Sequence, residues 1–161
     1  MRNKQKGFSL IELLIVVAII LIIAAIAIPN LIRSKIAANQ ASAVASLRTL
    51  NTASVLYMTN YNVWPPAYAN LGPVVPPALP SAALADMIDA TLVAAIPGSA
   101  GKSGYVFTFT SPGPNGLGYT ILADPVNPGT SGTVHYYTDS SLVIHYNAAA
   151  AAGAGDPVIG Q

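Results

Sequence analysis

Glu12 is a carboxylate near the start of a run of 21 mostly apolar residues, which covers positions 8–28. As an α-helix this run measures about 31 Å, which matches the hydrocarbon thickness of a bilayer. An acidic side chain costs about 2.5–3.5 kcal/mol at the centre of a membrane helix and less near its end. A carboxylate kept at such a cost is a candidate functional group, and it needs a positively charged partner.

The other reactive side chains do not form a catalytic motif. Gly101-Lys102-Ser103 resembles the end of a phosphate-binding loop, but that motif requires a glycine where Ile96 stands and a helix where a strand is expected. His135 and Asp139 form at most a weak metal pair, since the chain has no cysteine and Glu12 is its only glutamate. No nucleophile has a base and an orienting partner nearby in sequence. We therefore expect a protein that is not an enzyme and binds no cofactor.

The chain is unusually poor in charge. Of its 161 residues 53% are hydrophobic and 8% are charged, whereas about 25% is typical for charged residues. Three of the seven basic residues lie within positions 1–7, so a chain without that segment has four basic against six acidic residues, a net charge of −2. Such a balance gives no electrostatic reason to expect nucleic-acid binding.

One long helix is expected to carry Glu12. Helical periodicity continues past Pro29, which should kink or loosen the helix without ending it. Glycine is then absent until Gly72 and proline until Pro65, so the helix is predicted over about residues 8–57. Its first half is apolar on all sides and must be covered by lipid or by like helices, which is a physical argument for polymerisation.

The remainder is expected to form a small α+β domain. Proline-rich residues 64–80 predict a loop, and Ser81 is a possible cap for a short helix over about 82–95. Apolar and polar residues then alternate in four segments, which predict a four-stranded antiparallel meander packed on the long helix. These segments are residues 105–110, 119–123, 134–138 and 142–146. Residues 147–161 resemble a loosely held tail.

The N-terminus allows three interpretations. A secretory signal peptide fits the basic residues and the Ala25-Ile26-Ala27 sequence, but the apolar run is too long and contains Glu12. A plain membrane anchor, with the N-terminus in the cytoplasm, explains the length and leaves Glu12 unexplained. The third interpretation comes from a local motif: a short basic leader ending in Gly7, then Phe8-Ser9-Leu10-Ile11-Glu12, then Pro29 after the apolar run.

This motif closely resembles the prepilins, the class of type IV pilins and of the pseudopilins of type II secretion. The resemblance covers residues 2–30 tightly and the rest only in outline. It implies cleavage after Gly7, methylation of the new N-terminus at Phe8, and a pilin-like fold. It also implies a leader at 1–7, a transmembrane and filament-core helix at 8–28, and a periplasmic or extracellular domain at 29–161.

The expected function is that of a structural subunit, the major pilin of a type IV pilus-like filament. Phe8, Glu12 and Pro29 are the candidate assembly residues, and the expected partners are identical subunits, a prepilin peptidase and an inner-membrane assembly platform. The subunit is expected in the inner membrane before assembly and afterwards in a periplasmic or surface filament. Glu12 is one helical turn from the new amine at Phe8, so it can pair with that amine within one chain or in a neighbouring subunit.

Two alternatives remain open. The chain resembles the major pseudopilin of a type II secretion system, a branch in which calcium takes the place of the disulfide of many pilins. Asp124, Asn127 and Asp139 are weak calcium candidates here, because their spacing matches no EF-hand and such residues commonly form turns. The alternative of another class is a membrane-anchored periplasmic binding module that never polymerises.

Overall fold

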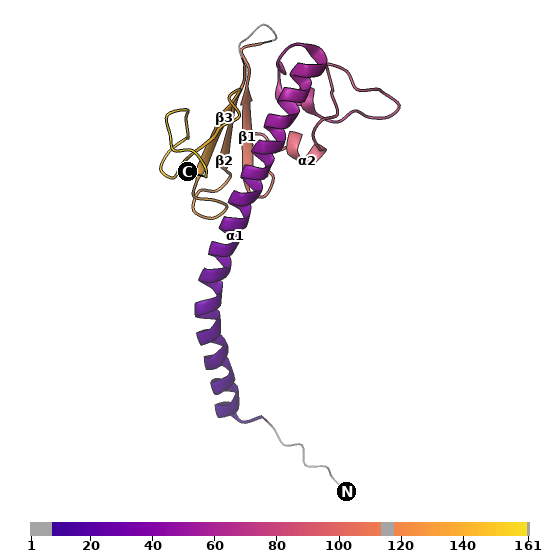
Figure 1. The fold of residues 1–161 in the computed structure, drawn as a ribbon. Helices are drawn as coiled ribbons and strands as arrows, with labels where there is room; N and C mark the ends of the chain where they lie inside the picture. Colours follow the sequence, from indigo (N-terminus) through magenta and orange to yellow (C-terminus); the bar gives the residue numbers. More distant parts are fainter. Residues whose placement is uncertain (1–7, 114–117, 161) are drawn as a thin grey trace. The chain divides into compact units, whose positions relative to one another are not determined.

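The computed structural model describes residues 8–113 and 118–160 (Figure 1). The chain separates into two compact units, one ending at Lys35 and the other beginning at Ile36.

The long helix α1 covers Leu10–Tyr61 and belongs to both units. The predicted helix over about 8–57 is confirmed, with both ends a few residues further along the chain. Pro29 lies inside α1 without ending it. The helix stops at Asn62, whose backbone is left-handed with φ of 58° and whose N–H donates to the Met58 carbonyl at 2.8 Å. Asparagine tolerates this conformation better than most residues, which makes it a suitable helix terminator.

The second unit contains a four-stranded antiparallel sheet in the order β1-β2-β3-β4, which confirms the predicted meander (Figure 1). Its strands are β1 (Tyr105–Thr110), β2 (Thr120–Pro125), β3 (His135–Asp139) and β4 (Ile144–Asn147). Alternate residues of β1, β2 and β3 are buried, as expected for a sheet with one face on the core. The prediction of an α+β fold is therefore correct.

The buried face of the sheet packs on the outer part of α1. The core combines helix residues such as Leu47, Leu50 and Tyr57 with sheet residues such as Phe107 and Ile121. A buried polar group also joins the two layers. Asn51 of α1 donates to the Thr138 hydroxyl at 2.9 Å and accepts from the Tyr119 hydroxyl at 3.0 Å.

The short helix is much shorter than predicted. Instead of about 82–95, helix α2 covers Ala90–Val93, and its N-cap is Asp89, which accepts from the Leu92 N–H at 2.8 Å. Ser81 is not a cap, because it forms an isolated bridge with Leu84. The backbone of residues 85–88 donates to carbonyls of residues 70–72. These tertiary hydrogen bonds hold that segment in a non-helical conformation and leave only one turn free to become helical. The proline-rich loop, in turn, contains a short 3₁₀ helix η1 (Tyr68–Leu71).

The C-terminal segment is not a loose tail. Val158 pairs with His145 in an antiparallel bridge, and the Ile159 N–H donates to the Ile144 carbonyl at 3.0 Å. Residues 157–159 therefore cover the free edge of β4. At the other edge of the sheet, Phe107 of β1 donates to the Ala95 carbonyl at 2.7 Å. These contacts make both sheet edges poor templates for pairing with another strand.

Candidate assembly site at the start of the long helix

The first unit consists of the apolar beginning of α1. The side chains of its large hydrophobic residues are exposed, from 45% at Val17 to 83% at Phe8. An 18-residue window of α1 has a mean hydropathy of 3.3, and none of it is buried. By length and composition this stretch could cross a membrane. A surface this apolar is unstable in water, so it requires lipid or other apolar helices around it.

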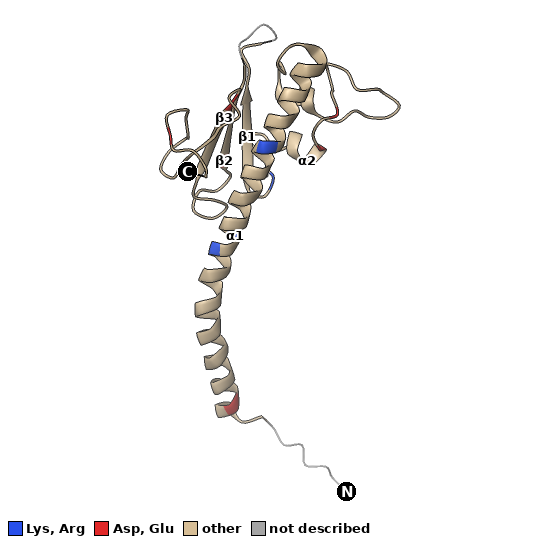
Figure 2. Ribbon diagram, viewed as in Figure 1, with Lys and Arg blue, Asp and Glu red and all other residues tan. Residues whose placement is uncertain are grey.

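Glu12 lies in the first turn of α1, where Figure 2 shows a red segment. Its carboxylate accepts a hydrogen bond from the backbone N–H of Ser9 at 2.9 Å. The Ser9 carbonyl accepts from the Leu13 N–H at 3.2 Å, so Ser9 is the N-cap and Glu12 is the third helical residue. This is the glutamate half of a capping box. The positive end of the helix dipole also favours a carboxylate at this position.

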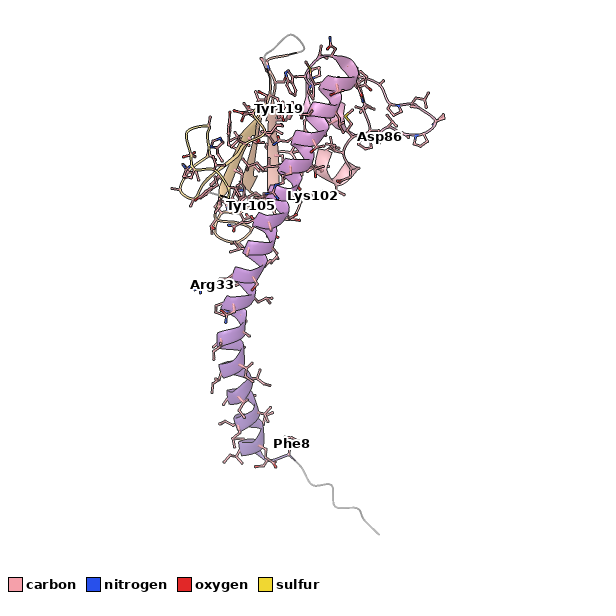
Figure 3. The ribbon with its side chains drawn as sticks, in the orientation of Figure 1. Phe8, Arg33, Asp86, Lys102, Tyr105 and Tyr119 are labelled. Atoms are coloured by element: carbon pink, nitrogen blue, oxygen red, sulfur yellow. The ribbon has the colours of Figure 1, made fainter. Side chains whose placement is uncertain are left out.

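The hydrogen bond from Ser9 places the Glu12 carboxylate close in the chain to Phe8, the residue that would become the N-terminus after the predicted cleavage. Phe8 immediately precedes Ser9, and Figure 3 shows it next to the first turn of α1. An amine on Phe8 would therefore lie one residue from the N–H that Glu12 already binds. Gly7 and the leader lie outside the described residues. The Ser9-to-Glu12 contact was not predicted, although the S-x-x-E spacing is the signal that could have found it.

Pro29 removes one backbone hydrogen bond at the end of the apolar run of residues 8–28, because proline has no N–H to donate to Ala25. Two side chains after it bond to helix carbonyls. Asn30 donates to the Ile26 carbonyl at 3.0 Å, and Ser34 donates to the Asn30 carbonyl at 2.9 Å. Helix α1 thus continues past Pro29, and the side chains of Asn30 and Ser34 add hydrogen bonds near the backbone bond that proline cannot make.

The calcium candidates do not come together. In the β2–β3 register Asp139 is opposite Thr120, four residues before Asp124, which is about 13 Å along a strand. Asp139 accepts from the Ser141 N–H at 2.8 Å, and the carbonyl of Asn127 accepts from the Ser131 side chain at 3.1 Å. Both are turn contacts. Among the described residues there is no group of three or more histidine and acidic side chains that could hold a metal.

The two histidines also have structural partners. His135 Nδ1 lies 2.6 Å from a carboxylate oxygen of Asp124 on the neighbouring strand, so the considered pair of His135 with Asp139 does not form. His145 Nδ1 lies 2.6 Å from the carbonyl of Asp156. A carbonyl can only accept, so this nitrogen of His145 carries the proton. The first contact depends on the register of β2 and β3, and the second on where the C-terminal segment lies along β4.

Comparisons with known proteins agree with the geometry of the N-terminus. Residues 2–28 match the prokaryotic N-terminal methylation motif. The type II secretion system core protein G of Escherichia coli is 30% identical over 130 residues, which is 81% of this chain and 77% of that protein. The type IV major pilin protein PilA of Myxococcus xanthus is 54% identical over 50 residues, 31% of this chain and 23% of that protein.

A third relative is the type IV wide pilus major component PilA4 of Thermus thermophilus. It is 47% identical over 62 residues, 38% of this chain and 47% of that protein. The chain spans only a quarter to a half of the Myxococcus and Thermus proteins.

Proposed function

Because this chain belongs to the family of type IV pilins and type II secretion core proteins G, we propose that it is the major subunit of a type IV pilus-like filament. Identical copies would assemble through their N-terminal helices. The observation that carries the proposal is the exposed apolar start of α1 with one carboxylate, Glu12, in its first turn.

The proposed pathway begins in the inner membrane. Residues 8–28 would span the bilayer with the basic leader, residues 1–7, on the cytoplasmic side. A prepilin peptidase would cut after Gly7 and methylate the amine of Phe8. An assembly platform would then move the subunit into the filament, where residues 8–28 exchange lipid for neighbouring helices. Residues 29–161 would form the outer layer of the filament.

Glu12 is proposed to set the position of each incoming subunit. The carboxylate would bind the Phe8 amine of a neighbouring subunit within the apolar core of the filament. Breaking a buried ion pair costs about 3–5 kcal/mol, since the remaining charge is left without compensation. A subunit at the wrong axial offset would leave Glu12 and the Phe8 amine unpaired in the apolar core. The offset that pairs them would therefore be favoured.

Two substitutions of Glu12 distinguish the proposed ion pair between subunits from helix capping within one chain. Glu12→Gln removes the charge and keeps an oxygen that can accept from the Ser9 N–H, whereas Glu12→Val removes both. We expect both variants to insert in the membrane and neither to give filaments in sheared fractions viewed by electron microscopy. The control is Ser9→Ala, which keeps the backbone N–H and the carboxylate. Normal filament numbers from Glu12→Gln would contradict the proposed ion pair.

Mass spectrometry of the N-terminus tests the processing step. A chain that begins at Phe8 with one added methyl group supports the filament subunit. An intact Met1 supports the alternative of a static, membrane-anchored binding module, which would never polymerise.

A second candidate function is that of the major pseudopilin of a type II secretion system. The relative matched over 77% of its length is a core protein G, which favours this alternative. The discriminating observation is where the polymer lies. Long extracellular fibres support the pilus, and a polymer confined to the periplasm supports the pseudopilus.

A further inference from the structure

Two residues of opposite charge in the second unit have no charged or hydrogen-bonding partner for their side chains among the described residues. Among residues 36–113 and 118–160, Lys102 pairs with Asp89 at 3.2 Å and His135 with Asp124. The carboxylates of Asp139 and Asp156 accept hydrogen bonds within the unit. Over the same residues the side chains of Arg48 and Asp86 make no hydrogen bond or salt bridge. Figure 2 shows how few charges this unit has, so one unpaired residue of each sign is notable.

Arg48 lies on an exposed ridge of α1. Arg48, Thr52 and Leu56 are exposed and are spaced four residues apart, so they lie along one side of the helix. A groove runs along each side of this ridge. One includes Ala53 and Met87, and the other includes Val55 and Leu142. The ridge thus places one positive charge between two largely apolar grooves.

Asp86 is held at a fixed position at the end of the proline-rich loop, where it is labelled in Figure 3. Its N–H donates to the Gly72 carbonyl at 2.9 Å, and its neighbours Ala85 and Met87 donate to residues 70 and 71. Its backbone is left-handed, with φ of 56°. These bonds fix the backbone, while the Asp86 side chain is exposed to solvent.

The loop before Asp86 exposes large apolar side chains. Val75 and Leu79 are 79% and 83% exposed, more than any other large hydrophobic residue described within the second unit. Pro73, Pro76, Pro77 and Pro80 restrict the loop, which lowers the entropy lost when it docks. An apolar, proline-restricted loop ending in a carboxylate is complementary to an apolar groove beside a guanidinium.

We propose that loop 73–86 of one subunit docks on the Arg48–Thr52–Leu56 ridge of a second copy of this chain, with Asp86 binding Arg48. The occupant is a second copy because the same chain supplies both unpaired charges and both apolar surfaces. Contacts of this kind join two different patches, so they repeat as an open helical array. The inference rests on the proposed function, since it requires a filament of identical copies.

Cross-linking tests the contact directly, because the natural chain has no cysteine. Arg48→Cys and Asp86→Cys are made as separate variants, co-expressed, and their sheared filaments are treated with a short bismaleimide. Since no molecule carries both cysteines, a product joining the two variants must be intermolecular. We expect a dimer from this mixture and none from Asp86→Cys mixed with Thr110→Cys, which lies at the end of β1. Filaments that assemble and give no Arg48-to-Asp86 dimer overturn the proposal.

Charge reversal provides a second measurement. Arg48→Asp and Asp86→Arg should each lower the yield of sheared filaments about fivefold, because an attractive contact becomes repulsive. The double variant should restore the yield, which a folding defect in either single variant would not allow. Equal loss in the double and single variants contradicts the pairing. If the unsubstituted chain forms no filaments at all, the proposed function fails instead.

Discussion

The carboxylate of Asp156 accepts from the Asn147 side chain at 3.0 Å and from the Gly153 N–H at 2.7 Å. The carbonyl of the same residue lies 2.6 Å from His145 Nδ1. Asp156 therefore fastens the C-terminal segment to β4 through two contacts, with Asn147 and His145, and the contact with Gly153 lies within the segment itself. The chain has no cysteine, so hydrogen bonds to Asp156 help to hold the C-terminal segment where no disulfide can.

We predict that Asp156→Ala destabilises the domain by about 1–3 kcal/mol, the usual cost of removing a partner from partly buried polar groups. The measurement is thermal unfolding of the full chain in detergent micelles. Asp156→Asn keeps one acceptor oxygen and should lose less. An unchanged midpoint for Asp156→Ala would show that the segment is held by Val158 and Ile159 alone.

Gly132 marks a place where only glycine fits. It is buried, and a Cβ added to it would overlap the hydroxyl of Tyr105, which donates to the Val134 carbonyl at 2.8 Å. We predict that Gly132→Ala destabilises the domain by about 1–3 kcal/mol through overpacking. The matched control is Gly155→Ala, since a Cβ there meets nothing within 4 Å. Chemical denaturation compares the two variants, and equal midpoints would contradict the predicted clash.

The cap of α2 should respond to acid. Hydrogen bonding from the Thr91 hydroxyl, more than from the Leu92 N–H and Lys102, lowers the pKa of Asp89 from 3.8 to about 2. The folded chain thus binds this proton more weakly than the unfolded chain does. The stabilisation is fully present above pH 3.8 and is lost as the pH falls toward about 2. Amide exchange in residues 90–93 measures the effect, and Asp89→Asn, which caps without titrating, should remove its pH dependence.

The large elements could be predicted because each has a continuous local signal. Between Pro29 and Pro65 no proline or glycine interrupts the apolar period of α1, and alternation marks each strand of the sheet. The helix predicted over 82–95 was wrong because the backbone N–H groups of residues 85–88 donate to carbonyls of residues 70–72 and not to carbonyls of their own segment. A contact between two loops has no periodicity, so no local pattern indicates it.

The candidate site residues were likewise predictable only where the sequence carries a local signal. Glu12 could be identified because an acidic residue in an apolar run conflicts with its surroundings. The pairing of His135 with Asp124 could not, because it depends on the register that the turn between β2 and β3 imposes. The attachment of the C-terminal segment was also missed, because alanine and glycine dominate residues 148–155 and give no local signal for the contacts that Asp156, Val158 and Ile159 make with β4.

Asn51 provides the sharpest test of how α1 is bound to the sheet. It is 6% exposed and joins Thr138 of β3 to the Tyr119 hydroxyl, both of which are buried. Burial raises the pKa of Tyr119 to about 12, which means that this phenol is strongly disfavoured as an anion inside the domain. Asn51→Leu would keep the side-chain volume and leave two buried hydroxyls without their partner.

We predict that Asn51→Leu costs about 1–3 kcal/mol for each hydroxyl left unsatisfied. Thr59→Ala is the control, because its exposed hydroxyl only returns to a carbonyl of its own helix. Adding Tyr119→Phe to Asn51→Leu should recover part of the loss, since one unsatisfied group disappears with the phenol oxygen. Unfolding of the parent chain, Asn51→Leu, Tyr119→Phe and the double variant completes a double-mutant cycle. Strictly additive losses would mean that the two residues do not stabilise each other through this hydrogen bond.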